Sequence, residues 1–150
     1  KAKFKTSCAK ALNSKSKLKS QAMKNQKVVY QTNKAPKPIG PYSQALQIGE
    51  TLYISGQIGL DPESGELQNN DLETETRQMM ANVKAILSEA GMNLENVIKC
   101  TIYLDNMDEF SKINQIYGEY FRERPPAREA IEISKLPKGA NVEISVIAVE

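Results

Sequence analysis

The 150-residue sequence contains no histidine and no tryptophan, and it has only two cysteines. Without histidine the chain lacks the commonest general base, the commonest metal ligand, and the Ser-His and Cys-His pairs of nucleophilic hydrolases. Cys8 lies in a lysine-rich N-terminal segment and Cys100 in a predicted strand, so their placement does not suggest a disulfide framework. The sequence therefore favours a reducing compartment and predicts no metal site.

Acidic residues are absent before Glu50, whereas 11 of the 20 basic residues precede it. From Glu50 onward the remaining 9 basic residues stand against all 18 acidic ones, a net charge of −9. An acidic globular part argues against binding to nucleic acid, which requires a basic surface. No apolar run approaches the length of a membrane span, so we expect no membrane-embedded segment.

Residues 1–25 form a lysine- and serine-rich extension without periodic hydrophobic positions. They lack the apolar core of a secretory signal, and two interpretations remain open. The extension is either a targeting peptide for an organelle such as a mitochondrion or plastid, with lysine in place of the more usual arginine, or a disordered tail on a cytoplasmic protein. Both interpretations assign the single globular domain to residues 26–150.

Hydrophobic periodicity in residues 26–150 predicts elements in the order β-β-β-α-β-α-β-β, which is an α+β fold. The first helix is expected from about Leu72 to Ala90, with Asp71 as its N-cap and Gly91 just after its end. The second helix follows Asp108. Its apolar stripe consists of Phe110, Ile113, Tyr117, Tyr120 and Phe121.

The strand "VIKCTIYL" is expected to bury Ile98, Cys100, Ile102 and Leu104. Two helices can cover only one face of a sheet of this size. The opposite face combines polar residues with residues that are too apolar for a fully solvated surface: Tyr53, Ser55, Thr101, Tyr103, Arg128, Ala130, Glu143, Ser145, Ile147 and Val149. We therefore expect this second face to be buried against other copies of the chain.

The stretch "PPAREAIEIS" predicts a strand in which Ile131 and Ile133 face the core and Arg128 faces the other way. Glu143 is expected on the same non-core face as Arg128. One interpretation is a structural ion pair at a subunit interface, because such pairs often imitate active sites. The other is a site for a small anionic substrate, in which the arginine binds a carboxylate through two parallel hydrogen bonds and the glutamate handles a water or a proton.

Several segments, taken in order, resemble the RidA/YjgF family of reactive-intermediate deaminases: "IGPYSQA", "LYISGQIG", "NVKAILSEAG", "FSKINQIYGEYF" and "PPAREAIEISKLPKGANVEISVIA". The resemblance covers about residues 26 to 150. It implies a chorismate-mutase-like fold, with a mixed six-stranded sheet and two helices on one face. It also implies a homotrimer whose sheets form a central barrel, with ligand clefts between subunits.

The same resemblance implies the residues of the cleft. Arg128 matches the substrate-binding arginine, and Glu143 matches the glutamate near the attacking water. Tyr42 matches a tyrosine that lines the cleft, and Ser55 and Gly56 match the segment whose backbone lies against the ligand. From the sequence alone, Tyr42 could equally be a turn aromatic, and Ser55 with Gly56 the end of a strand at a tight turn.

Two further positions bear on the resemblance. Asn114 interrupts the stripe of the second helix and matches a cleft asparagine, whereas without the family it would be interpreted as a capping or surface residue. Some members carry a cysteine two residues after the arginine, where this chain has Ala130. Since other members also lack that thiol, the expected hydrolysis is not put in doubt.

The resemblance implies an enzyme that hydrolyses 2-imino or 2-enamino acids, such as 2-aminoacrylate and 2-iminopropanoate, to 2-oxo acids and ammonia. These reactive compounds are by-products of pyridoxal-phosphate enzymes. An imine carbon is already electrophilic, so this reaction needs no metal, cofactor or histidine. The alternatives are an endoribonuclease or translation inhibitor, and a non-catalytic ligand sensor or chaperone that uses the same cleft.

Overall fold

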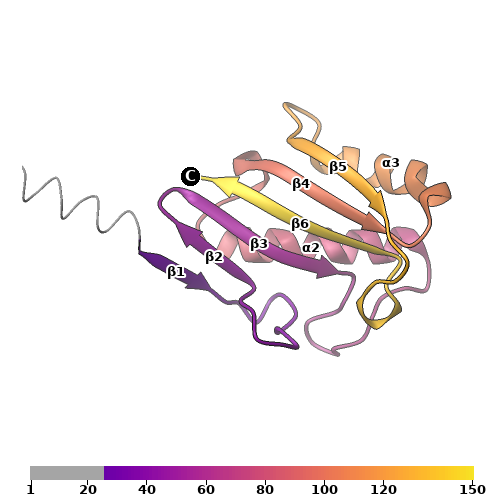
Figure 1. Cartoon of the computed structure of the whole chain (residues 1–150), viewed down its shortest axis with the longest axis horizontal. Helices are drawn as coiled ribbons and strands as arrows, with labels where there is room; N and C mark the ends of the chain where they lie inside the picture. The colour runs from indigo at the N-terminus through magenta and orange to yellow at the C-terminus, as the bar shows by residue number, and fades with distance from the viewer. Residues whose placement is uncertain (1–25) are drawn as a thin grey trace, which may run out of the picture.

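The computed structural model describes residues 26–150, in which six strands form one mixed sheet in the order β1-β2-β3-β6-β4-β5 (Figure 1). The strands are β1 (Lys27–Tyr30), β2 (Ala45–Ile48), β3 (Thr51–Ile58), β4 (Val97–Leu104), β5 (Ala127–Glu132) and β6 (Val142–Val149). Only β4 and β5 pair in parallel, and the other neighbours are antiparallel. The extension proposed for residues 1–25 lies outside the described residues.

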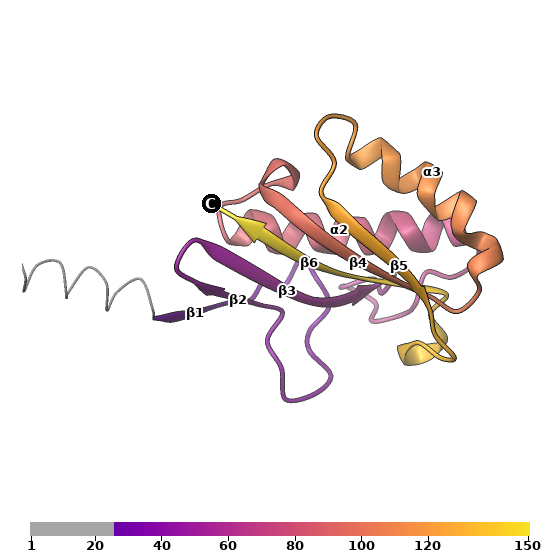
Figure 2. The same ribbon diagram turned by 45° about the horizontal axis from the view of Figure 1, so that its top comes forward.

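Two α-helices, α2 (Leu72–Glu89) and α3 (Phe110–Tyr120), lie side by side on one face of this sheet (Figure 2). Short 3-10 helices precede β4, α3 and β6, at Leu94–Asn96, Met107–Glu109 and Pro137–Gly139. The predicted order of elements and the single helical layer are therefore confirmed.

The ends of α2 follow from local sequence. The Asp71 carboxylate accepts hydrogen bonds from the backbone N–H and the hydroxyl of Thr74, both at 2.8 Å, and so satisfies a free donor of the first turn. After the helix, Gly91 takes a φ of 72°, a left-handed conformation that glycine adopts without strain. Both predicted boundary signals are confirmed.

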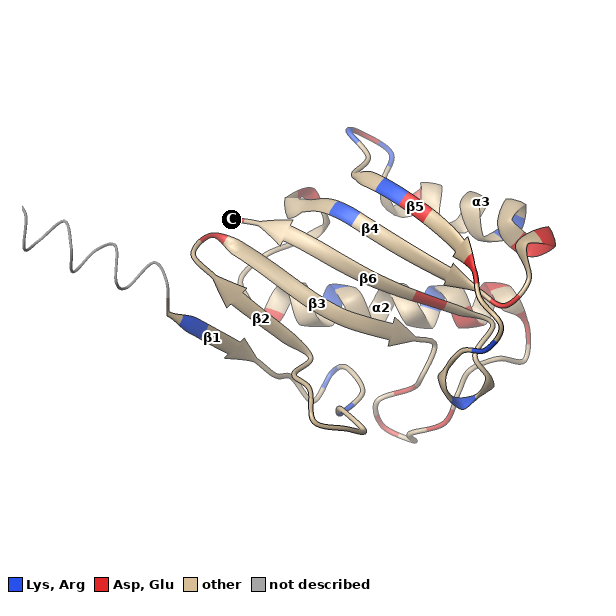
Figure 3. Ribbon diagram, in the orientation of Figure 1, with Lys and Arg blue, Asp and Glu red and all other residues tan. Residues whose placement is uncertain are grey.

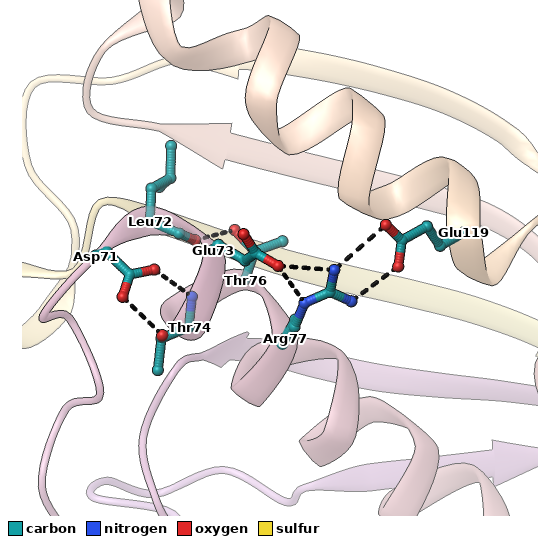
Figure 4. A network of polar contacts seen from close by, with 7 residues as sticks. All are labelled: Asp71, Leu72, Glu73, Thr74, Thr76, Arg77 and Glu119. Carbon is teal, nitrogen blue, oxygen red and sulfur yellow. Dashed lines mark hydrogen bonds and ion pairs between the residues drawn. The ribbon is translucent and has the colours of Figure 1, made fainter.

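An arginine on α2 connects the two helices at their exposed edge (Figure 4). Arg77 donates from its two terminal nitrogens to the carboxylate of Glu119 on α3, at 2.8 and 3.2 Å, and from Nε to Glu73 at 2.9 Å. The hydrogen bonds that Arg77 donates to Glu119 and Glu73 raise its pKa. Because all three side chains are solvent-exposed, the network orients the helices more than it stabilises them.

The core lies between the sheet and the helices, and β4 contributes to it differently from the prediction. Cys100, Ile102 and Leu104 are fully buried, but Ile98 is 50% exposed, so the prediction that Ile98 is buried is wrong. The pairing of β4 with β6 shifts between Val97 and Lys99. This irregularity breaks the alternation of faces and turns Val97 into the core instead, with 5% of its surface exposed.

Strand β5 presents the opposite face from the one predicted. Its parallel register aligns Arg128 with Cys100 and Ala130 with Ile102. Residues in register on adjacent strands share a face, so Arg128 and Ala130 lie on the helix side. Accordingly Ala130 packs against the core, whereas Ile131, which was predicted to face it, is 43% exposed.

The other sheet face is not covered by any element of residues 26–150, and its central strands carry few charged residues (Figure 3). Val29 and Tyr53 are 57% and 46% exposed there. On this face Lys99 of β4 and Glu129 of β5 are paired, because Glu129 accepts hydrogen bonds from Lys99 and, at 2.8 Å, from Thr101. An apolar face of this kind is typical of an interface. Within residues 26–150, neither helix has the length and hydropathy of a membrane span.

A buried carboxylate fastens α2 to the start of β6. Glu75 is fully buried, and its two oxygens accept hydrogen bonds from the backbone N–H and the side-chain amide of Asn141, at 2.8 and 2.5 Å. Gly59 lies directly against it, since a Cβ there would meet the Glu75 backbone oxygen at 2.7 Å. Glu75 therefore holds the loop before β6 by hydrogen bonds and packs closely against the backbone at Gly59.

Glu75→Leu should reduce the free energy of unfolding by roughly 3 kcal/mol, because it leaves two partly buried donors of Asn141 without partners. Urea denaturation at one protein concentration measures this loss. Glu89→Leu is the matched control on the exposed side of the same helix, and its effect should stay within about 0.5 kcal/mol. Equal stabilities of the two variants would contradict the role assigned to Glu75.

Candidate functional site

A cavity of about 400 Å³ opens beside the paired end of β3 and start of β6, and we call it the Glu143 cavity. Four residues implied by the family resemblance lie in its wall: Tyr42, Ser55, Gly56 and Glu143. The first comes from the loop before β2, the next two from β3 and the last from β6. The structure thus brings together four of the six expected site residues.

The cavity is shaped by a bulge in β3. Ile54 pairs with Val146 and Gln57 with Ile144, so Ser55 and Gly56 together stand opposite a single residue of β6. The Ser55 hydroxyl donates to the carbonyl of Ser43 at 2.7 Å, which directs it away from bulk solvent. The sequence interpretation of a strand ending at a tight turn is wrong, because β3 continues to Ile58.

Gly56 provides the space that the carboxylate of Glu143 occupies. A Cβ at position 56 would lie 1.7 Å from Oε1 of Glu143, far inside van der Waals contact. Within residues 26–150 the Glu143 carboxylate has no hydrogen-bond or ion-pair partner, and its burial raises its pKa above the ordinary value. A half-buried carboxylate with a raised pKa and no partner is suited to accept a proton.

The remaining expected residues, Asn114 and Arg128, line a second pocket of about 360 Å³, the Arg128 pocket. It lies between α3 and the start of β5, and the loop residues Pro125 and Pro126 complete its wall. Asn114 is exposed on α3, as its surface interpretation predicted, but it also faces this pocket.

Arg128 is held by aromatic rings instead of by an acidic side chain. Its guanidinium carbon lies 4.7 Å from the ring centre of Tyr117 and 5.5 Å from that of Phe110, within the range of cation–π contacts. None of the ion pairs within residues 26–150 involves Arg128. Stacking fixes the plane of the guanidinium and leaves its N–H donors available for a bidentate acceptor.

Arg128 and Glu143 do not share a face of the sheet, so that prediction is wrong. Glu143 alternates with buried Val142 and Ile144 and therefore points away from the helices, whereas Arg128 points toward α3. The reason is the parallel register of β5, which places Arg128 beside Cys100. Within one chain the two charges form no ion pair, and each belongs to its own pocket.

The surroundings of Arg128 also contain a buried thiol and a buried hydroxyl. Burial raises the pKa of Tyr117 and that of Cys100. The Tyr117 hydroxyl has no hydrogen-bond partner in the described part of the chain. Both groups remain protonated at neutral pH, so Arg128 is the cation of this pocket and has no fixed counter-charge.

Sequence analysis missed two kinds of site residue. Phe110 and Tyr117 were assigned to the core stripe of the second helix, although they also stack on Arg128. Their position on the same face as the arginine would have been visible only with the correct register of β5. Gln44 was not singled out, although it is 1% exposed and lines the Glu143 cavity. The available signal in the sequence was the glutamine that directly follows "GPYS".

Within residues 26–150, no group of three or more cysteine, aspartate or glutamate side chains could hold a metal ion. What the described site offers is a planar cation for a carboxylate in one pocket and a proton acceptor in the other.

Comparison with known proteins assigns the chain to a family. The family model "Endoribonuclease L-PSP" matches residues 32–150. A RutC family protein of Pyrococcus horikoshii is 52% identical over 122 residues, which are 81% of this chain and 97% of the relative. The chain belongs to the RidA family. The resemblance noted in the sequence is therefore confirmed.

Named relatives and solved structures agree with this membership. A mouse RidA-family relative, "2-iminobutanoate/2-iminopropanoate deaminase", is 48% identical over 122 residues, covering 81% of this chain and 90% of the relative. RidA from an Antarctic Psychrobacter has a TM-score of 0.79 at 40% identity, over 82% of this chain and 99% of the other. Escherichia coli TdcF, solved with bound serine, also has a TM-score of 0.79, at 34% identity, over 82% of this chain and 98% of the other.

Gly56→Ala tests whether the space above the bulge positions the carboxylate. The new methyl group must displace the end of the Glu143 side chain, so we expect turnover to fall on the order of a hundredfold with little change in stability. Hydrolysis of the imine substrate that the family resemblance implies and thermal unfolding are measured side by side.

Gly91→Ala is the control for this substitution. It adds the same methyl group at a position with a φ of 72° and no neighbour within 4 Å, so it should cost about 1 kcal/mol of stability and leave turnover unchanged. Wild-type turnover in Gly56→Ala would show that the position of the carboxylate does not matter.

Proposed function

We propose that this chain hydrolyses small 2-imino and 2-enamino acids to 2-oxo acids and ammonia. The observation that carries the proposal is the pair of unpartnered charges, Arg128 in one pocket and Glu143 in the other. The carboxylate of a 2-imino acid can bind Arg128, and its imine carbon can react beside Glu143. The deaminase name of the mammalian relatives and the serine bound to TdcF support a small amino-acid-like ligand.

The proposed site forms between two copies of the chain. Because the two pockets lie on opposite sides of the sheet within one chain, a single small molecule needs the Arg128 pocket of one copy and the Glu143 cavity of another. The uncovered sheet face, with exposed Val29, Tyr53 and Ile131, supplies the apolar surface for association. We infer the homotrimer with a central barrel that the family resemblance implies.

In this site the guanidinium of Arg128 binds the substrate carboxylate through two parallel hydrogen bonds. Glu143 accepts a proton from a water molecule as the water oxygen adds to the imine carbon. The protonated Glu143 returns this proton to the nitrogen, which gives a carbinolamine. Glu143 then takes the hydroxyl proton of the carbinolamine and passes it to the amine nitrogen, the carbon–nitrogen bond breaks, and ammonia leaves a 2-oxo acid. One water is consumed, and the chain ends in its starting protonation state.

Two other functions are less well supported. An endoribonuclease, the activity in the name of the family model, needs a phosphate-binding surface, whereas residues 50–150 carry a net charge of −9. A non-catalytic sensor or chaperone would use the same two pockets, and only turnover separates it from the deaminase. Imine decay behind a threonine dehydratase, with and without this protein, tests the choice; no acceleration would refute the deaminase.

Mixing two inactive variants tests whether the site is shared between copies. Arg128→Ala retains the Glu143 cavity and Glu143→Gln retains the Arg128 pocket. If the variants are unfolded and refolded together at equal concentration, about one quarter of the interfaces pair two intact halves, so about a quarter of wild-type turnover should return.

Each variant refolded alone is the control and should stay inactive. An inactive mixture that has exchanged subunits, as verified by mass spectrometry of the intact assembly, would contradict a shared site. Light scattering that gives only a monomer at micromolar concentration would contradict the assembly itself.

Arg128→Lys tests the geometry of carboxylate binding. Lysine keeps the positive charge but presents no planar pair of donors, and it loses most of the stacking on Tyr117. Turnover should fall by at least about a hundredfold, equivalent to roughly 3 kcal/mol of transition-state stabilisation. Near-normal turnover with the assembly intact would mean that only the charge of Arg128 matters.

A further inference from the structure

The loop that forms the rim of the Glu143 cavity is fastened to the sheet by one buried side chain. Gln44 lies just before β2 and is 1% exposed. Its Oε1 accepts a hydrogen bond from the backbone N–H of Thr32 at 2.7 Å. Its Nε2 donates to the carbonyls of Thr32, Ala35 and Pro36, at 3.0, 3.1 and 2.8 Å. A single amide thus contacts four backbone groups of residues 32–36, with its two N–H hydrogens shared among three carbonyls.

The backbone of the same residue closes the other end of the loop. The Ser55 N–H donates to the carbonyl of Gln44 at 3.0 Å, and the Ser55 hydroxyl donates to that of Ser43 at 2.7 Å. The rim loop, residues 37–42, therefore runs between two fixed ends, Pro36 and Ser43. The Gln44 amide holds Pro36, and the Ser55 hydroxyl holds Ser43.

Between these ends the rim loop has only local hydrogen bonds. Tyr42 donates from its N–H to Gly40 at 2.9 Å, and its hydroxyl accepts from the N–H of Ile39 at 3.4 Å. Ile39 and Tyr42 are 68% and 50% exposed, and both line the cavity. A segment with so few contacts of its own owes its conformation to its anchors.

We propose that Gln44 is a positioning residue that holds the rim loop in its ligand-binding conformation. Its amide acts through residues 32–36 and does not touch the reacting atoms. An ordered rim lowers the conformational entropy that a ligand must remove on binding, so the effect of Gln44 falls on affinity more than on the chemical step. The kinetic test of this inference rests on the proposed function, whereas the test by amide hydrogen exchange does not.

Gln44→Leu tests this role, because leucine has a similar size and no hydrogen-bonding group. Amide hydrogen exchange of Thr32 and of the rim loop should accelerate at least about tenfold. The KM for the imine and the Kd of 2-oxobutanoate, measured by calorimetry, should each rise about tenfold, with kcat within about threefold of wild type.

Leu87→Ala is the control for a general loss of stability. Leu87 is a fully buried residue of α2 and does not line the cavity, so its truncation should lower the melting temperature without changing KM or the exchange of Thr32. Two results would overturn the proposal: unchanged exchange in the rim loop of Gln44→Leu, or accelerated exchange with wild-type KM and Kd.

Gln44→Glu provides a second variant if Gln44→Leu does not fold. It keeps the acceptor for Thr32, but an ionised carboxylate would face the three carbonyl oxygens that Nε2 now contacts. Binding of 2-oxobutanoate should therefore be weak at neutral pH and recover at acidic pH, where the protonated carboxyl donates again. Binding without this pH dependence, relative to wild type, would count against the proposal.

These measurements separate the inference from the proposed function. A wild-type protein that fails to accelerate imine decay would refute the deaminase. Hydrogen exchange in the rim loop needs neither substrate nor turnover, so it still decides whether Gln44 orders the loop.

Discussion

The parallel pairing of β5 with β4 decides on which face of the sheet Arg128 lies. Its register places Arg128 beside Cys100 on the helix side of the sheet. There the arginine meets the rings of Tyr117 and Phe110, and no acidic residue of its own face neutralises it. Glu143, on antiparallel β6, keeps the opposite face. The register of β5 thus separates the two charges within one chain, and the proposed association of copies would bring them together.

Much of the fold could be predicted from the sequence, because its signals are local. Asp71 and Gly91 mark the ends of α2, and hydrophobic periodicity gives each strand and helix. The errors arise where pairing between distant strands overrides local alternation. Ile98 is exposed because β4 shifts against β6, and Arg128 changes face because β5 takes its orientation from β4. Neither register can be obtained from the residues of one strand.

The candidate site, like the fold, could be predicted from the sequence only in part. Family resemblance pointed to six residues, and the structure distributes them over two pockets. What no motif indicated is the support beneath them: the bulge that exposes Gly56, the rings around Arg128, and the buried amide of Gln44. These contributions depend on backbone groups and ring planes, which single-sequence patterns do not encode.

Gly56 has a consequence for how Glu143 handles a proton. The carboxylate is kept in place by the shape of the space above the glycine and accepts no hydrogen bond from residues 26–150. Most buried carboxylates are held by donors, and taking up a proton then breaks or weakens those bonds. Here the charged and neutral forms can occupy one geometry, so a proton can arrive and depart with little rearrangement of the surrounding protein. The proposed role of Glu143, as base and then as acid in successive steps, requires such low reorganisation.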